Sequence, residues 1–180
     1  MLNTHELPVV DTRGGDDTAM IVYSSGTSGK PKGVVLSHDN MVTGTHIFEL
    51  LSFGEWGPKS VVIGVLPFFH IFGLNFFALS SFLCATPVVV IPRFDLTVFC
   101  GAVQRFKCTQ ALVVPPMLLA LSRHPAVDKF DMSSLKAALS GAAPLGPELI
   151  EEVQARLPHL RISQGCLLYT SDAADDMQCV

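Results

Sequence analysis

The stretch YSSGTSGKPKG, residues 23–33, has the composition of a loop that could bind phosphate groups. Glycine exposes backbone N–H groups that can cradle phosphate oxygens, while hydroxyl and ammonium groups add hydrogen-bond donors and positive charge. The residues that could act in this way are Ser24, Ser25, Gly26, Thr27, Ser28, Gly29, Lys30 and Lys32. A solvated linker between two strands explains the composition equally well.

The spacing within this loop differs from that of a P-loop NTPase. The P-loop pattern is G-x-x-x-x-G-K-[ST], and it opens a helix. Here two residues separate Gly26 from Gly29, Pro31 follows Lys30, and the apolar run GVVL that comes next predicts a strand. Phosphate held here would therefore be bound without help from a helix dipole.

His70 and the turn SGAAPLG, residues 140–146, are two further positions of chemical interest. His70 stands in the apolar stretch LPFFHIFGL, where a lone histidine is more often a satisfied core residue than a catalytic one. The turn follows a predicted strand, and ligands of open α/β sheets bind at the carboxyl ends of strands. A strand-to-helix turn without a ligand explains the same residues equally well.

The elements that would position these residues alternate between strands and helices. Apolar runs predict strands at 19–24, 33–38, 60–67, 86–92, 109–116, 134–141 and 160–165. Apolar periodicity and helix-start signals predict helices at 40–53, 70–85, 96–106, 116–124 and 146–158. This alternation predicts an α/β fold with a mainly parallel sheet and flanking helices.

Composition excludes several classes of protein. The 180 residues are 49% hydrophobic and 16% charged, with a net charge of −4 and no basic block, so nucleic acid is not an expected partner. The five cysteines include no C-x-x-C pair, which argues against a zinc site and favours reduced thiols inside the cell. Residues 60–92 carry no Asp, Glu, Lys or Arg, but proline, glycine and polar residues interrupt them, so we expect no transmembrane segment.

Four motifs together resemble those of the adenylate-forming (AMP-binding) superfamily. YSSGTSGKPKGVVLSH, LPFFHIFGL, SGAAPLG and ISQG occur in its order and rough spacing, over roughly residues 15–165. The sequence looks most similar to acyl-CoA synthetases and 4-coumarate–CoA ligases. The resemblance implies an acid–thiol ligase that joins a small carboxylic acid to AMP with release of pyrophosphate, and then passes the acyl group to coenzyme A.

The resemblance implies catalytic roles for Lys32 and His70. Lys32, in the family's "PKG" position, would stabilise the leaving pyrophosphate, and His70 would position the carboxylate rather than act as a base. The other phosphate-binding residues would be Ser24, Ser25, Gly26, Thr27, Ser28 and Gly29.

The same resemblance implies where the remaining parts of the substrates bind. An apolar acyl pocket would be formed by His70, Phe72, Phe76 and Ala143. The adenine nucleotide would lie against Gly141, Ala142, Ala143, Gln164 and Gly165. Arg93 would lie near the phosphates of coenzyme A, an assignment that rests only on its spacing from the family motifs. The pocket suits both aryl and fatty acyl groups.

The sequence departs from the superfamily after ISQG. The family continues with YGMTE or a close variant, whose Thr contacts AMP and whose Glu helps to hold Mg²⁺, but this chain continues with CLLYTSDAADD. We therefore expect a lead-in at 1–17, a partial AMP-binding domain at 18–165, and a non-native tail at 166–180 of frameshift or adaptor origin. No metal ligand is expected in such a fragment, although its parent enzyme would use ATP and Mg²⁺.

Three interpretations stay open at this stage. The first is a fragment of an ATP-dependent carboxylate–CoA ligase that is inactive alone, from a cytoplasmic or peroxisomal enzyme. The second is another ATP-using enzyme of P-loop type, although the loop spacing argues against it. The third is a truncated polypeptide without function.

Overall fold

The structure is a computed structural model that describes residues 14–24, 31–51 and 55–165. Loop residues 25–30 and the tail at 166–180 lie outside the described residues, as does most of the lead-in. The predicted origin of the tail therefore stays a prediction.

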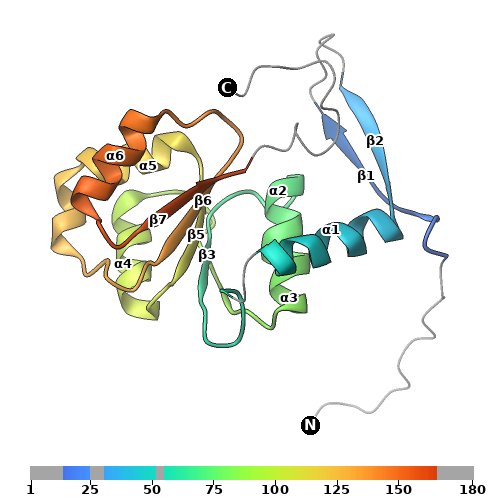
Figure 1. The fold of residues 1–180 in the computed structure, drawn as a ribbon, viewed down its shortest axis with the longest axis horizontal. Helices are drawn as coiled ribbons and strands as arrows, with labels where there is room; N and C mark the ends of the chain where they lie inside the picture. Colours follow the sequence, from blue (N-terminus) through green and yellow to red (C-terminus); the bar gives the residue numbers. More distant parts are fainter. Residues whose placement is uncertain (1–13, 25–30, 52–54, 166–180) are drawn as a thin grey trace.

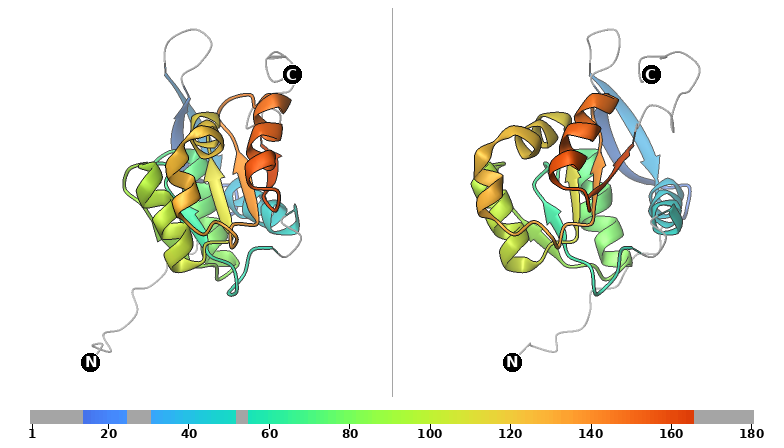
Figure 2. Two further views of the ribbon diagram at one scale, coloured as in Figure 1. Left: turned by 90° about the vertical axis from the view of Figure 1, so that its left-hand side faces the viewer. Right: turned by 60° about the vertical axis from the view of Figure 1, so that its left-hand side comes forward.

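The first two strands form an antiparallel hairpin. β1 is Thr18–Ser24 and β2 is Lys32–Ser37, and Ser24 is the register partner of Lys32. Figure 2 shows the hairpin projecting beyond the rest of the molecule. The strands expected at 19–24 and 33–38 are confirmed.

A five-stranded parallel sheet forms the centre of the molecule. Its order is β4-β3-β5-β6-β7, and every neighbouring pair runs parallel. The strands are β3 Val62–Gly64, β4 Val88–Val90, β5 Gln110–Val113, β6 Ala137–Ser140 and β7 Arg161–Gln164. The expected α/β fold is confirmed. Each of these strands is shorter than the apolar run that predicted it, because the run also includes residues that turn away from the sheet.

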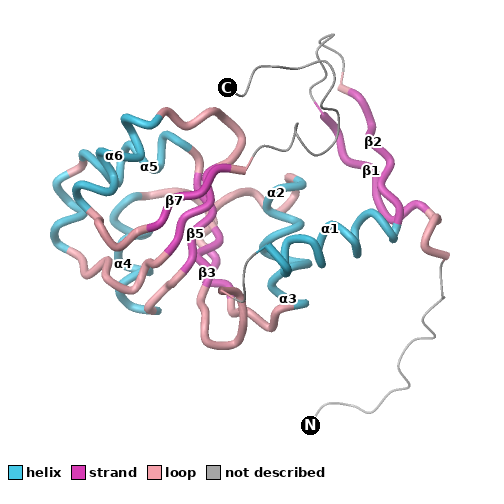
Figure 3. The backbone as a smooth tube through the Cα atoms, in the orientation of Figure 1, coloured by secondary structure: helices cyan, strands magenta, loops and turns pink. Residues whose placement is uncertain are grey.

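Helices cover both faces of this sheet (Figures 1 and 3). On one face lie α4 Leu96–Phe106, α5 Pro115–Arg123 and α6 Pro147–Arg156, with the 3₁₀ helix η2 Pro125–Lys129 after α5. On the other face lie α2 Ile71–Gly73, the π-helix η1 Leu74–Ser80 and α3 Ser81–Leu83, with α1 His38–Leu51 packed outside them. The helix expected at 70–85 is thus present, but its middle is a π-helix.

The main hydrophobic core lies between the sheet and α4, α5 and α6. The helices bury Phe99, Val103, Leu118, Leu121 and Val153. They pack against the side chains that point to the same face of the sheet, among them Ile63, Ala111, Val113 and Ala138. A smaller cluster of Val62, Phe77 and Leu112 lies on the opposite face, where α2 and η1 cover the sheet.

Polar side chains define where the helices begin and end. Ser37 and Asn40 exchange hydrogen bonds at the start of α1: the Asn40 N–H donates to Ser37 Oγ, and the Ser37 N–H donates to Asn40 Oδ1. At the start of α4, Asp95 Oδ1 accepts from the Val98 N–H at 3.0 Å. Arg156 of α6 donates to the Leu121 and Ser122 carbonyls at the end of α5, which joins these helices.

The hairpin and α1 expose an unusual number of large apolar side chains. These are Ile21, Tyr23, Val34, Val35, Val42, Ile47 and Leu50. Extended apolar surface of this kind usually marks a region that contacts other protein. Within the described residues, no helix is both long enough and apolar enough to cross a membrane.

The buried face of α4 provides a test of the main core. Val103→Ala should lower the free energy of unfolding by about 2 kcal/mol, because Val103 is fully buried and the deletion leaves a cavity. The matched control is Val98→Ala on the same helix, where Val98 is 53% exposed. Urea denaturation that gives equal stabilities for the two variants would contradict this packing.

Candidate functional site

The candidate site lies at the carboxyl edge of the parallel sheet. Because β5, β6 and β7 run parallel, their last residues form one row, in which Val113 is paired with Ser140 and Ser140 with Gln164. The backbone hydrogen bonds extend one residue beyond this row. The Gly141 N–H donates to the Val113 carbonyl at 3.2 Å, and the Gly165 N–H donates to the Ser140 carbonyl at 2.9 Å.

Three residues predicted from separate motifs meet at this edge. A methyl group at Gly141 would lie 3.1 Å from Phe72 Cζ and 3.4 Å from the Gly165 carbonyl oxygen. A side chain at Gly141 would crowd the Phe72 ring and the turn after β7, because both approach its backbone closely. The LPFFHIFGL, SGAAPLG and ISQG segments converge here, and the binding roles expected of their residues stay predictions.

His70 is exposed and occupies the N-cap position of α2. Its Nδ1 atom accepts a hydrogen bond from the Phe72 N–H at 3.2 Å. A neutral imidazole with Nδ1 as acceptor carries its proton on Nε2, so the outer nitrogen can donate to a ligand. The alternative of a core histidine is wrong for this chain, because His70 is exposed, as are its neighbours Phe68 and Phe69.

The turn after β6 holds an alanine in a strained backbone conformation. Ala142 has φ of 67°, in the left-handed region that normally favours glycine. Gln164 braces the turn, because its Oε1 accepts from the Leu145 N–H at 3.3 Å and Leu145 is buried. Ala142 and Ala143 are exposed at its tip, and no described residue hydrogen-bonds to the buried Ser140 Oγ beneath it. Strain of this kind is found most often at ligand sites.

Four aromatic residues form a continuous wall beside this edge, here called the aromatic wall: Phe72, Phe76, Phe48 and Trp56. Successive ring centroids are 5.0 Å apart for Phe72–Phe76, 4.5 Å for Phe76–Phe48 and 4.9 Å for Phe48–Trp56. All three pairs meet edge to face. Sequence reasoning found Phe72 and Phe76 but missed Phe48 and Trp56, since no local pattern connects α1 or residue 56 with η1.

Lys32 and Arg93 lie apart from the cluster around Gly141. Lys32 is the exposed first residue of β2, and among the described residues it makes no ion pair. Arg93 is exposed just after the carboxyl end of β4. Of the predicted phosphate-binding residues, Ser24 is described in its backbone alone, and Ser25, Gly26, Thr27, Ser28 and Gly29 lie outside the described residues.

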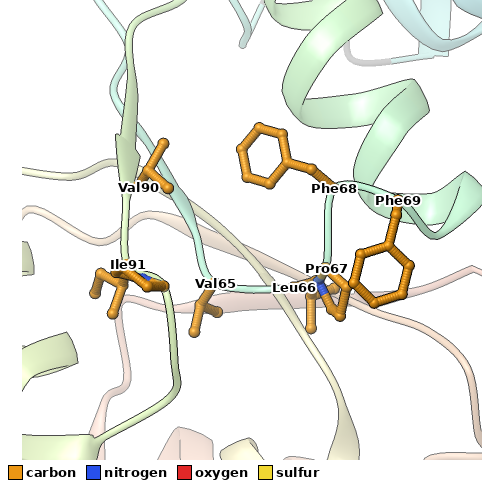
Figure 4. Close-up of a pocket in the computed structure, with 8 residues that line it drawn as sticks. Val65, Leu66, Pro67, Phe68, Phe69, Val90 and Ile91 are labelled. Atoms are coloured by element: carbon orange, nitrogen blue, oxygen red, sulfur yellow. The ribbon is translucent and has the colours of Figure 1, made fainter.

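An apolar hollow of about 230 Å³ opens at the carboxyl ends of β3 and β4 (Figure 4). Its lining is Val65, Leu66, Pro67, Phe68, Phe69, Val90, Ile91 and Pro92. None of these side chains is a charged or hydrogen-bonding group that could hold phosphate. The two lining segments end immediately before His70 and Arg93 in the chain, but neither of those residues lines the hollow.

Cysteine and metal chemistry find no support in the described part of the chain. Burial raises the pKa of the Cys100 and Cys108 thiols to about 11, so neither is a thiolate near neutral pH. Those residues also hold no group of three or more His, Cys, Asp or Glu side chains that could bind a metal ion.

The sequence of nearly the whole chain matches a known protein family. The AMP-binding enzyme family matches residues 3–166. The chain belongs to the AMP-binding enzyme family. This AMP-binding chain is 43% identical over 155 residues to 4-coumarate–CoA ligase 2 of Oryza sativa subsp. japonica. The aligned region covers 83% of this chain and 27% of that relative. It is 38% identical over 169 residues to 4-coumarate–CoA ligase 2 of Nicotiana tabacum, covering 91% of the chain and 30% of the relative.

Solved structures agree with this membership. ATP-bound MatB from Rhodopseudomonas palustris has a TM-score of 0.75 and 30% identity, over 85% of this AMP-binding chain and 30% of MatB. The inhibitor-bound N-terminal domain of FACL13 from Mycobacterium tuberculosis has a TM-score of 0.73 and 26% identity, over 85% of the chain and 37% of that domain. The chain thus spans about 30% of the curated relatives it matches. The predicted superfamily is confirmed, and membership argues against the P-loop alternative.

The helix cap at His70 can be tested by substitution. His70→Ala should lower the free energy of unfolding by about 1 kcal/mol, because the Phe72 N–H then loses its acceptor. His70→Asn, which supplies a side-chain oxygen at the same position, should recover most of that loss in urea denaturation. Equal losses in the two variants would contradict a capping role.

Proposed function

We propose that this chain is the phosphate- and acyl-binding part of an ATP-dependent carboxylate–CoA ligase. The convergence of Phe72, Gly141 and Gly165 at one sheet edge carries the proposal, because it brings three separate motifs of the AMP-binding family into a single site. Exposed His70 next to that edge, with a donor on Nε2, supports it further.

In the proposed first step, a carboxylate oxygen of the acid attacks the α-phosphorus of ATP. The bond from the α-phosphorus to the bridging oxygen breaks, and its electrons leave with pyrophosphate. Lys32 would stabilise the charge that develops on the leaving group, together with the donors of the loop at 24–29. His70 Nε2–H would hold the carboxylate in position by donating to its second oxygen.

In the proposed second step, the sulfur of coenzyme A attacks the acyl carbonyl carbon and gives up its proton to solvent. The bond from that carbon to the phosphate oxygen of AMP breaks, its electrons leave with AMP, and the thioester forms. Arg93 would bind phosphate groups of coenzyme A, for which an exposed guanidinium is suited. The adenine would lie against the turn at Gly141, Ala142 and Ala143, where small side chains let a flat ring approach the backbone.

The acid itself would be apolar, either aryl or fatty. Phe72, Phe76 and Ala143 offer no charged group to a substrate tail, and the aromatic wall continues the apolar surface away from the turn. The Mg²⁺ that accompanies ATP would take its ligands from outside the described residues, since no acidic cluster occurs within them.

Activity would belong to the whole protein, since the chain spans about 30% of its curated relatives. The 180-residue chain by itself would be inactive and prone to aggregate, and its exposed apolar residues on the hairpin and α1 favour this view. If a sample of the 180-residue chain is monodisperse, melts cooperatively and binds ATP, the view that the chain alone is inactive and prone to aggregate would be overturned.

The lysine of the loop tests the proposed reaction. In the full-length protein, Lys32→Ala should lower kcat/KM for ATP–pyrophosphate exchange about 100-fold, as expected when a charge-stabilising donor is removed from a transition state. Lys129→Ala, which removes a lysine of η2 on the far side of the sheet, is the matched control and should leave the rate unchanged.

Product analysis completes that test. Consumption of ATP and acid should yield AMP and pyrophosphate. Release of ADP and phosphate, or no exchange with any acid from a panel of aryl and fatty acids, would refute the proposed function.

A further inference from the structure

We propose that Phe48 and Trp56 are positioning residues that determine the depth of the acyl site. They act through Phe76, which in turn holds the Phe72 ring against Gly141. The inference rests on the proposed function, since the site that they shape is the one assigned to the acyl group.

Contacts within the aromatic wall carry the argument. Phe76 is held between Phe72 on one side and Phe48 on the other, with interplanar angles of 82° and 88°. Trp56 lies 4.9 Å from Phe48 and 6.4 Å from Phe76, so it supports both rings from behind. Edge-to-face rings in a continuous row cannot move independently, because each ring occupies the space into which its neighbour would rotate.

The far end of the aromatic wall is anchored to the sheet. Glu55, next to Trp56 in the chain, forms an ion pair with Arg161 at the start of β7. Ser60 Oγ donates to the Glu55 carbonyl, which closes the same segment on itself. Trp56, Phe72 and Phe76 also pack against Val62, Phe77 and Leu112 on the sheet. The end at Trp56 is therefore fixed, and the end at Phe72 faces the site.

The backbone that carries Phe76 supports the same conclusion. Phe76 lies in the π-helix η1, and π-helical segments occur preferentially at functional sites. α1 packs against η1 at this residue, because the Phe48 and Phe76 ring centroids lie 4.5 Å apart. The position of α1 therefore determines where Phe48 meets Phe76, and so how far the Phe76 ring can withdraw from the site.

Substrate selectivity provides the main test, using saturated carboxylic acids of four to twelve carbons in ATP–pyrophosphate exchange by the full-length protein. Phe48→Ala and Trp56→Ala should each raise the ratio of kcat/KM for decanoate to that for butanoate about 10-fold, because Phe76 can move back and deepen the site. The KM for ATP should not change. Trp56→Phe, which keeps an aromatic edge beside Phe48, should retain the wild-type ratio.

Phe106→Ala is the matched control, since Phe106 lies on α4 on the opposite face of the sheet and is outside the aromatic wall. It should leave the ratio unchanged. A wild-type ratio in both Phe48→Ala and Trp56→Ala, with melting temperatures close to that of the wild type, would overturn the inference and leave the aromatic wall a purely structural feature.

A spectroscopic arm separates failure of this inference from failure of the proposed function. Trp56 is the single tryptophan of the 180-residue sequence, so its emission reports on the aromatic wall without ATP turnover. Titration of the full-length protein with decanoate and with 3-phenylpropanoate should shift the part of the emission that Trp56→Phe removes, and Phe76→Ala should abolish the shift. Exchange activity in the full-length protein without any Trp56 response would refute the role of the aromatic wall alone. A Trp56 response without exchange would refute the ligase proposal alone, and the absence of both would refute both.

Discussion

Parallel pairing of β5, β6 and β7 is the constraint on which the candidate site depends. It aligns the last residue of each strand in one row, so that the turns after β6 and β7 begin side by side. Gly141 and Gly165 then continue the ladder by one hydrogen bond each. The Phe72 ring can contact the first of these turns because Gly141 has no side chain. Gly141 and Gly165, which are far apart in the sequence, become neighbours through backbone pairing.

Helix α2 and the turn before it depend on a similar close approach of backbone segments. A Cβ atom at Gly73 would collide with the Pro67 carbonyl oxygen, so the chain can fold tightly back after β3 only with glycine at this position. The resulting turn exposes His70 and directs its Nδ1 atom to the Phe72 N–H. One hydrogen bond thus couples the orientation of the imidazole to the position of the aromatic ring beside it.

The parts that could be predicted from sequence are those encoded over a few neighbouring residues. Alternating apolar runs and helix-start residues such as Asp95 predicted the order of elements, and the turn SGAAPLG was correctly expected at the carboxyl end of a strand, since β6 ends at Ser140. The orientation of His70 could not be predicted, since apolar neighbours do not reveal which way a capping residue points. Phe48 and Trp56 were missed because their contacts with Phe76 come from the packing of α1 and of residue 56 against η1, which no local sequence pattern encodes. The π-helix has no known local signature either.

The separation between the hairpin and the sheet edge has a thermodynamic consequence for ligand binding. Lys32 belongs to a two-stranded unit, and such units are only marginally stable by themselves. The turn at Gly141 belongs to the larger parallel sheet. A nucleotide that contacts both the β1–β2 hairpin and the parallel sheet would link two units of unequal stability. Its binding free energy would then be added to the free energy of unfolding of the hairpin, which is the weaker unit. At a concentration of 100 Kd this amounts to about 2.7 kcal/mol. Amide hydrogen exchange in β1 and β2 would then slow on nucleotide binding by far more than exchange in β5 or β6.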